Sequence, residues 1–131
     1  MAFVYLSLDD AIRAIAILKI GPVRDIGLLD SALSRPRASA FGKDAYPTLG
    51  LKAAALLHSL TKNHCLVDGN KRIAWFLKSI VCDLNGFIAD ISDDVAFNLV
   101  WDLAAGDAPL TKIESQLNLQ PSLSPTTLHE R

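Results

Sequence analysis

The sequence predicts an all-α fold, a compact bundle with a short polar loop between two central buried helices. Composition and apolar patterning both lead to this prediction. The chain has 131 residues, of which 50% are hydrophobic and 21% are charged, as is typical of one globular domain with its own core. Apolar residues recur at helical spacing along most of the chain. Residues 49–60 and 70–85 are apolar on most of their faces, which is typical of buried helices.

The first third of the chain is expected to hold two short helices. Ser7 is a good N-cap, and the Gly21-Pro22 pair ends the helix that follows it. A second helix is expected over residues 28–34, because Pro36 disfavours helical backbone in the residue before it.

The middle of the chain holds the two buried helices and a possible flap before them. Residues 36–48 contain prolines and a glycine and are expected to form a loop or a small hairpin flap. The first central helix covers residues 49–60. The second runs from Asn70 to the Asn85-Gly86 pair, which is a good helix C-cap.

The last third predicts a short extended link, two more helices and a tail. Residues 87–91 form the link, and Ser92 caps a helix over residues 93–105. A final helix is expected to complete a domain of residues 1–119. Residues 120–131 are rich in Pro, Ser and Thr and are expected to be a disordered tail.

Charge and cysteine content exclude several classes of function. The formal net charge is −1 and the pI is about 6.3, so no global basic field favours direct nucleic-acid binding. Cys65 and Cys82 form neither a disulfide framework nor a CxxC motif, which indicates a reducing compartment. The N-terminus lacks the pattern of a signal peptide, and the apolar runs are too short to cross a bilayer. We therefore expect a cytoplasmic protein without membrane attachment.

A nine-residue stretch between the two buried helices concentrates the polar chemistry of the chain. Its sequence is His64-Cys65-Leu66-Val67-Asp68-Gly69-Asn70-Lys71-Arg72. The unpaired N–H groups of the helix that starts there suit a phosphate, and Lys71 and Arg72 add positive charge. His64 can accept a proton near neutral pH. The stretch therefore predicts phosphoryl or nucleotidyl transfer to a hydroxyl.

Several of these residues have more than one interpretation. Asp68 could be the N-cap of the second central helix, a ligand of Mg²⁺, or both. Gly69 could supply a positive φ or a close approach to a phosphate. Asn70 could be a cap or could fix the loop internally. A purely structural role for His64 would not explain two cations at a helix N-terminus, which oppose the helix dipole unless an anion binds there.

Other conspicuous side chains are expected to be structural. Cys65 is expected to be a small buried hydrophobe rather than a nucleophile, because the chain offers no third group to orient a Cys–His pair. His58 lacks metal-ligand spacing to His64. Trp75 and Trp101 lie in apolar helical segments and are expected in the core rather than as a platform for a base.

The nine-residue stretch resembles the Fic/Doc signature HxFx(D/E)GN(G/K)R. The lysine at the eighth position is similar to the Doc branch, the "death on curing" toxins of toxin–antitoxin modules. The resemblance covers about residues 3–118. Further similar phrases are Arg24-Asp25, Gly27-Leu28-Leu29, Ala32-Leu33, Arg35-Pro36, Tyr46-Pro47 and Asn85-Gly86.

The resemblance implies a fold and a set of roles. Fic-fold proteins are all-α with the motif between two central helices. By match to the motif, His64 is the general base on a protein hydroxyl and Asp68 coordinates Mg²⁺. Gly69 and Asn70 form the anion nest, and Arg72 contacts phosphate.

The residue at position 71 separates the two reactions known in the family. Adenylylating members carry Gly there, which leaves room for the β- and γ-phosphates, whereas Lys71 fills that space with a positive charge. Doc-type toxins transfer the γ-phosphate of ATP to a hydroxyl of translation elongation factor Tu and so arrest translation. The resemblance therefore implies a protein kinase with ATP and Mg²⁺ as cofactors. AMP transfer remains the alternative, and a catalytically weak nucleotide-binding or interaction module is the third.

Two departures from the signature and one missing segment complete the comparison. Leu66 replaces the usual Phe, which removes buried area at a cost of about 1 kcal/mol, and Cys65 replaces a frequent Pro. Both leave open how well ordered the loop is. No self-inhibitory [S/T]xxxE[G/N] helix precedes the motif, and Thr126 and Glu130, which have this spacing, lie in the expected tail. The resemblance therefore implies an antitoxin whose C-terminal segment folds into an apolar groove.

Overall fold

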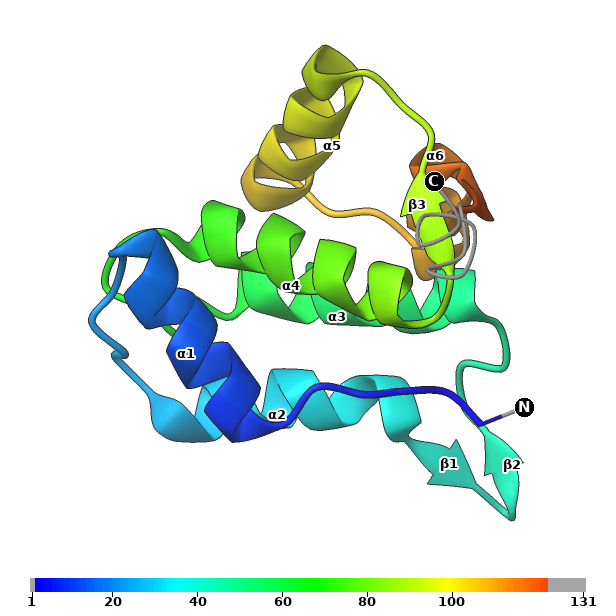
Figure 1. Ribbon diagram of the computed structural model, residues 1–131, viewed down its shortest axis with the longest axis horizontal. Helices are drawn as coiled ribbons and strands as arrows, with labels where there is room; N and C mark the ends of the chain where they lie inside the picture. Colours follow the sequence, from blue (N-terminus) through cyan, green and yellow to red (C-terminus); the bar gives the residue numbers. More distant parts are fainter. Residues whose placement is uncertain (1, 123–131) are drawn as a thin grey trace, which may run out of the picture.

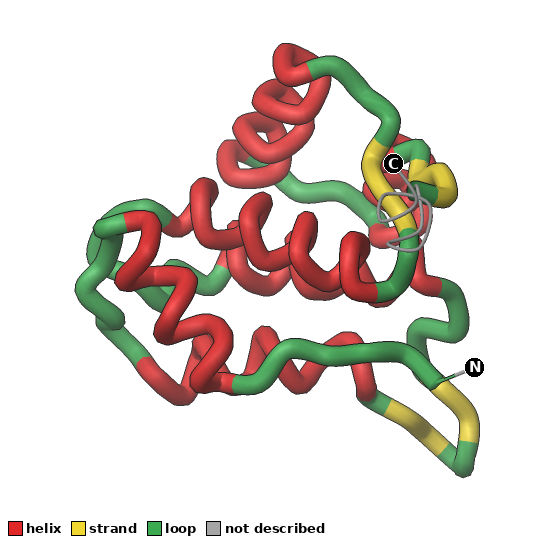
Figure 2. Tube along the Cα trace, viewed as in Figure 1, coloured by secondary structure: helices red, strands yellow, loops and turns green. Residues whose placement is uncertain are grey.

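Six α-helices, one 3₁₀ turn and two small antiparallel sheets form the structure, a computed structural model that describes residues 2–122 (Figures 1 and 2). The all-α prediction, with a small β flap, is confirmed. The helices are α1 (Leu8–Leu18), α2 (Ile26–Ser34), α3 (Leu49–Lys62), α4 (Asn70–Leu84), α5 (Asp93–Ala105) and α6 (Leu110–Leu117). The 3₁₀ turn is η1 (Arg35–Arg37), and β1 (Ser39–Ala40) pairs with β2 (Lys43–Asp44) as β3 (Phe87–Ala89) pairs with β4 (Leu119–Pro121).

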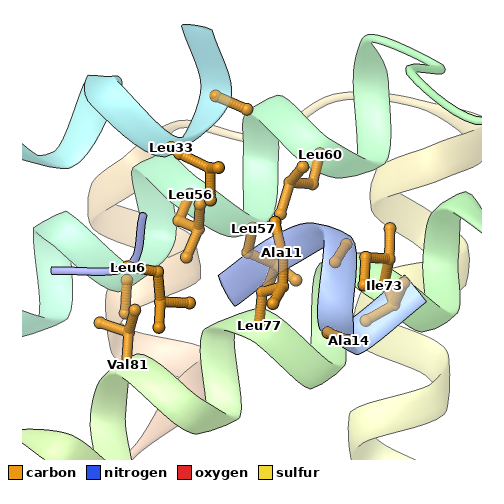
Figure 3. Close-up of a cluster of buried hydrophobic side chains, with 14 of the residues drawn as sticks. Leu6, Ala11, Ala14, Leu33, Leu56, Leu57, Leu60, Ile73, Leu77 and Val81 are labelled. Atoms are coloured by element: carbon orange, nitrogen blue, oxygen red, sulfur yellow. The ribbon is translucent and has the colours of Figure 1, made fainter. Parts of the chain in front are cut away.

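Helices α3 and α4 lie side by side in the centre of the molecule. Figure 1 shows α1 and α2 on one side of this pair and α5 and α6 on the other. Apolar side chains from α1 to α4 meet in the core, where Leu57 and Leu77 are fully buried (Figure 3). None of the helices within residues 2–122 is both long and apolar enough to span a membrane.

Side-chain caps fix where three of the helices begin. Ser7 and Asp10 form a capping box on α1, in which the Ser7 hydroxyl accepts a hydrogen bond from Asp10 N at 3.2 Å. Ser92 caps α5 as predicted, through a 3.2 Å bond from Val95 N. Helix α2 begins two residues earlier than predicted, because the Asp25 carboxylate accepts a hydrogen bond from the third N–H of the helix.

The end of the described chain differs at two residues from the tail predicted for residues 120–131. Helix α6 ends at Leu117, and Asn118 takes a left-handed conformation with φ of 47° that reverses the chain. Gln120 then pairs with Ile88 in the sheet of β3 and β4. The predicted disorder is therefore wrong for residues 120–121, because their backbone joins a sheet. The predictions for Thr126, His129 and Glu130 lie outside the described residues.

A buried lysine fixes the flap made by β1 and β2. Lys52 on α3 is 1% exposed, yet its ammonium is satisfied on several sides. It donates to the Pro36 carbonyl at 3.2 Å and pairs with the Asp44 carboxylate at 3.3 Å. The rings of Phe3 and Tyr5 lie beside it, with centroids 4.7 and 5.6 Å from Nζ. This lysine ties the second strand of the flap to the central helix.

Candidate active site

The loop between α3 and α4 is held in place by a segment 40 residues away in sequence. Four backbone hydrogen bonds of 2.7 to 3.1 Å join residues 65–68 to residues 21–25. We call residues 21–25 the strap. Val23 of the strap and Leu66 of the loop form an antiparallel bridge. Arg24 adds a side-chain bond, since its Nε donates to the His64 carbonyl at 2.7 Å. The loop therefore has a defined shape before any ligand binds.

The side chains of Leu66 and Asn70 anchor the loop to the rest of the protein. Leu66 is 1% exposed and lies in the core, so this replacement for the usual Phe still serves as an apolar anchor. The Asn70 side chain bonds both polar groups of the Leu66 backbone, accepting from its N–H and donating to its carbonyl, each at 2.9 Å. Asn70 thus fixes the loop internally, which selects one of the two interpretations that the sequence left open.

Cys65 is fully buried, in agreement with a small hydrophobic role. Burial raises the pKa of its thiol above the ordinary value. A thiol with a raised pKa is a poor nucleophile at neutral pH, because the thiolate is the reactive form. The structure therefore gives no support to chemistry at this sulfur.

His64 lies at the open edge of the loop. Its backbone has a φ of +52°, a left-handed conformation that is uncommon for a residue with a side chain. The side chain is exposed, and its ring makes no hydrogen bond within residues 2–122. The loop contacts of the neighbouring backbone hold this conformation, which leaves the imidazole exposed at the surface.

Gly69 begins α4 and allows the sharp entry of the chain. Its φ is +91°, and a Cβ there would lie 2.7 Å from Cβ of Ile20, so any larger residue would meet both backbone strain and a clash. The N-cap position of α4 belongs to Gly69 and not to Asp68, which corrects one interpretation of the aspartate. Glycine has no side chain to cap the helix.

The N-terminus of α4 is consequently open. The first helical hydrogen bond runs from Ile73 N to the Gly69 carbonyl at 2.9 Å. The N–H groups of Asn70, Lys71 and Arg72 have no partner within the described part of the chain. These three donors at the positive end of a helix dipole form a site suited to a phosphate.

Two cations stand beside these open N–H groups. Lys71 and Arg72 are both exposed, and neither makes an ion pair with any described residue. The Lys71 ammonium lies 4.7 Å from the ring centroid of Trp101 on α5. The charge of both residues therefore adds to the positive potential of the helix end.

Asp68 is exposed immediately before Gly69 and has one free carboxylate oxygen. Its Oδ1 accepts a hydrogen bond from Gly69 N at 2.9 Å, and its Oδ2 has no partner among residues 2–122. No group of three or more His, Cys, Asp or Glu side chains able to hold a metal occurs in that range. Asp68 fits Mg²⁺ as a single carboxylate ligand, an arrangement that Mg²⁺ uses when phosphate oxygens and water complete its shell.

An apolar groove of about 480 Å³ starts at the cations and runs between α4 and α5. Two aromatic rings of α5 stack along it, with centroids of Phe97 and Trp101 5.4 Å apart. Trp101 is 52% exposed, so the prediction that it lies in the core is wrong. Trp75 is half-buried and packs against the core. Periodicity could not make this distinction, because α5 is apolar on both the core side and the groove side.

His58 forms part of a structural cluster, as the sequence predicted. Its Nδ1 accepts a hydrogen bond from Arg35 at 3.1 Å, and its Nε2 lies 2.8 Å from the Asp107 carboxylate. The hydrogen bond from His58 lowers the pKa of Asp107 below the ordinary value. Arg35 also donates to the Tyr46 hydroxyl at 3.0 Å, which holds the base of the flap. This histidine joins η1, α3 and the α5–α6 connection.

The structure thus brings the residues predicted from the sequence to one edge. Residues His64, Asp68, Gly69, Asn70, Lys71 and Arg72 all lie in the loop and the first turn of α4. The positioning roles of Ile20 and Arg24 were not identified from the sequence, since both depend on contacts with distant residues. Only the resemblance drew attention to Arg24.

Comparisons with known proteins agree with this geometry. The model of the Fic/DOC family matches residues 5–82. The chain is also 46% identical over 117 residues to a protein named Toxin Doc from Mycolicibacterium smegmatis. That alignment covers 86% of this chain and 90% of the relative.

Proposed function

Because this chain belongs to the Fic/Doc family, we propose that it is a Doc-like toxin with protein kinase activity. The reaction is transfer of the γ-phosphate of ATP to a Ser or Thr hydroxyl of a protein target. One observation carries the proposal: α4 begins with three unpaired N–H groups and two cations in its first turn, and neither cation forms an ion pair with a described residue. Such an arrangement is stabilised when a phosphate binds.

The residues at this edge divide the chemistry between them. The imidazole of His64 takes the proton of the target hydroxyl, whose oxygen then attacks the γ-phosphorus while the bond to the β-phosphate breaks and ADP leaves. The N–H groups of α4, with Lys71 and Arg72, stabilise the negative charge of the transferring group. Asp68 would hold Mg²⁺, which supplies further neutralisation of phosphate charge.

Lys71 favours phosphoryl over adenylyl transfer. Its side chain occupies the first turn of α4, where the adenylylating members of the family carry glycine. A lysine leaves less room there for the β- and γ-phosphates of a nucleotide bound for AMP transfer. It also offers a point charge to a terminal phosphate.

The proposed target is translation elongation factor Tu, whose modification would arrest translation. The flap of β1 and β2 is the element best suited to align a target chain, because short exposed strands can pair with an extended segment. Phe41 at its turn is fully exposed, which adds an apolar contact for a partner. Lys52 and Arg35 hold the base of the flap and so fix its position relative to α3.

An antitoxin is the proposed inhibitory partner, and its C-terminal segment would occupy the groove between α4 and α5. The toxin name of the relative supports such a partner. The groove exposes the rings of Phe97 and Trp101 next to Lys71 and Arg72. An amphipathic segment with an acidic end would fit this surface and cover the two cations that bind phosphate.

The proposal is tested by intact-mass analysis of purified elongation factor Tu after incubation with the chain, Mg²⁺ and ATP. A gain of about 80 Da, one phosphoryl group, is expected. The same reaction with His64→Ala should leave the target unmodified. A gain of about 329 Da would assign AMP transfer instead, and an unmodified target in every reaction would overturn the proposed kinase–target pair.

A further inference from the structure

A second buried lysine lies on α4, outside the candidate active site. Lys78 is 1% exposed and sits above the ring of Trp75, with Nζ 3.3 Å from the ring centroid. Its ammonium makes neither a hydrogen bond nor an ion pair within residues 2–122. Lys52, which is equally buried, has a carboxylate and a carbonyl partner. Lys78 is thus a buried cation that no described protein anion balances.

The side chain of Lys78 lines a cavity of about 530 Å³. The cavity is lined by residues of α4, β3 and the start of α5. Its walls are largely apolar and include the side chains of Phe76, Ile80, Phe87 and Ile91. This volume is in the range of small-molecule sites, which combine apolar walls with a few polar groups.

We propose that this cavity binds a small carboxylic acid with an apolar body, whose carboxylate pairs with the Lys78 ammonium. A buried charge is costly unless it is paired, and one carboxylate would supply the missing partner. The apolar walls would bury the body of the ligand.

The charges around the cavity favour a ligand with a single negative charge. Asp83 on α4 and Asp93 at the start of α5 line the cavity and are exposed, and neither pairs with Lys78. They would repel a multiply charged anion such as a nucleoside triphosphate. The remaining titratable neighbour is the buried thiol of Cys82, whose pKa burial raises. The site is therefore chemically distinct from the phosphate-binding end of α4.

Burial also changes the titration of Lys78. Loss of solvent lowers its pKa to about 8, because the charged form is disfavoured. An adjacent carboxylate would favour the charged form and raise this pKa towards the ordinary value for lysine. Ligand binding should therefore be coupled to proton uptake above pH 8.

The test uses decanoate as the probe, with 1-decanol as its uncharged counterpart, and the full chain without nucleotide. Isothermal titration should show binding of decanoate that weakens at least about tenfold in Lys78→Met, whereas 1-decanol binds both proteins alike. Lys71→Met, which removes a cation from the other groove, should bind decanoate as the wild type does. Equal decanoate affinity in wild type and Lys78→Met would overturn the proposal, and so would a loss caused only by Lys71→Met.

A second measurement needs no substitution at the site. Protein produced with carbon-13-labelled lysine, which leaves the buried ammonium unmodified, can be titrated by NMR through its lysine Cε resonances, with and without decanoate. The Lys78 resonance should titrate near pH 8 in the free protein and at least about one unit higher with decanoate bound. An unchanged titration at saturating decanoate would contradict the inference. Neither measurement requires ATP or a target, so a failed kinase assay leaves this test intact.

Discussion

Helices α3 and α4 pack against each other along the centre of the bundle, but their N-termini are built differently. The hydroxyl of Thr48 caps α3, accepting from Leu51 N at 3.1 Å and donating to the Glu114 carboxylate at 2.6 Å. Helix α4 begins at Gly69, which has no capping side chain, and carries Lys71 and Arg72 in its first turn.

The N-terminus of α3 is built for stability, whereas the N-terminus of α4 is suited to binding an anion. The Thr48 cap satisfies an N–H group and stabilises α3 by an amount that a substitution can measure. The two cations of α4 oppose the dipole of their own helix, so we expect this end to gain stability when a phosphate binds. Local rules of helix formation are followed at α3 and broken at α4, which agrees with the binding site proposed there.

The largest effect should come from His64, the proposed general base, which we expect to contribute little to the fold. His64→Ala should lower the rate of phosphoryl transfer by about 10²- to 10⁴-fold, the range for loss of a general base. Its thermal unfolding should match the wild type, because the ring has no hydrogen bond in the described structure. Single-turnover kinetics with labelled ATP measure the rate. A variant with undiminished transfer would exclude His64 as the base.

The stability contribution of the buried Lys78 should depend on pH. The pKa of Lys78 is lowered to about 8 in the folded state, whereas an unfolded lysine titrates near 10.4. Between these values the unfolded state binds more protons, so the stability contribution of Lys78 should rise with pH from about 8 to about 10, by up to about 3 kcal/mol. Below pH 8 both states are charged, and the contribution is constant.

Denaturant unfolding of the wild type and of Lys78→Met, measured across this pH range, isolates the effect. The difference in unfolding free energy between the two proteins should change with pH in the stated direction. A parallel comparison of the wild type with Lys71→Met, which removes an exposed lysine, provides the control. A pH-independent difference for Lys78→Met would contradict the depressed pKa.

Gly69→Ala should disturb the start of α4 by two separable effects. The alanine would adopt a φ of +91° and place its Cβ 2.7 Å from Ile20, so we expect a loss of about 2–3 kcal/mol in unfolding free energy. Gly42→Ala in the flap is the matched control, because its φ is +77° but no atom lies within 4 Å of the added Cβ. It should lose only about 1 kcal/mol. Equal losses in the two variants would show that the contact with Ile20 does not matter.

The smallest effect is expected at the cap of α3. Thr48→Ala removes one helix cap and should lower the unfolding free energy by about 1 kcal/mol. Binding of ATP, measured by calorimetry, should be unchanged, because the cap does not belong to the end that carries Lys71 and Arg72. Ser92→Ala, which removes the cap of α5, should behave in the same way. A large loss of nucleotide binding in Thr48→Ala would contradict the proposal that only the N-terminus of α4 takes part in binding.

Local signals in the sequence were enough to predict most of the fold. Caps such as Ser7 and Ser92 act within three residues, so their positions could be predicted without tertiary information. The pairing of β4 with β3 could not, because three-residue strands have little pattern and their partners lie about 30 residues apart. The flap was predicted from its turn residues, although the ion pair that holds it, between buried Lys52 and exposed Asp44, was not.

The candidate site was predicted as a set of residues but not as a geometry. A motif of nine consecutive residues brings its own members together, so His64, Asp68 and Arg72 could be identified from spacing and from the resemblance. Their orientation depends on the distant strap at residues 21–25, which no local pattern encodes. The exposure of Trp101 was missed for a similar reason, since α5 has an apolar groove side that only the packing of α4 and α5 defines.

The hydrogen bonds between the strap, residues 21–25, and residues 65–68 also determine when during folding the loop takes its shape. The hydrogen bonds that shape the loop join segments about 40 residues apart, so the loop acquires its form only after α1 and α2 have docked on the central helices. A chain that is partly synthesised, or cut between α1 and α2, would carry every residue of the motif without its arrangement. In the intact protein, the amide protons of Gly21, Arg24 and Val67 form the hydrogen bonds between the strap and the loop. They should exchange with solvent only when the whole domain opens.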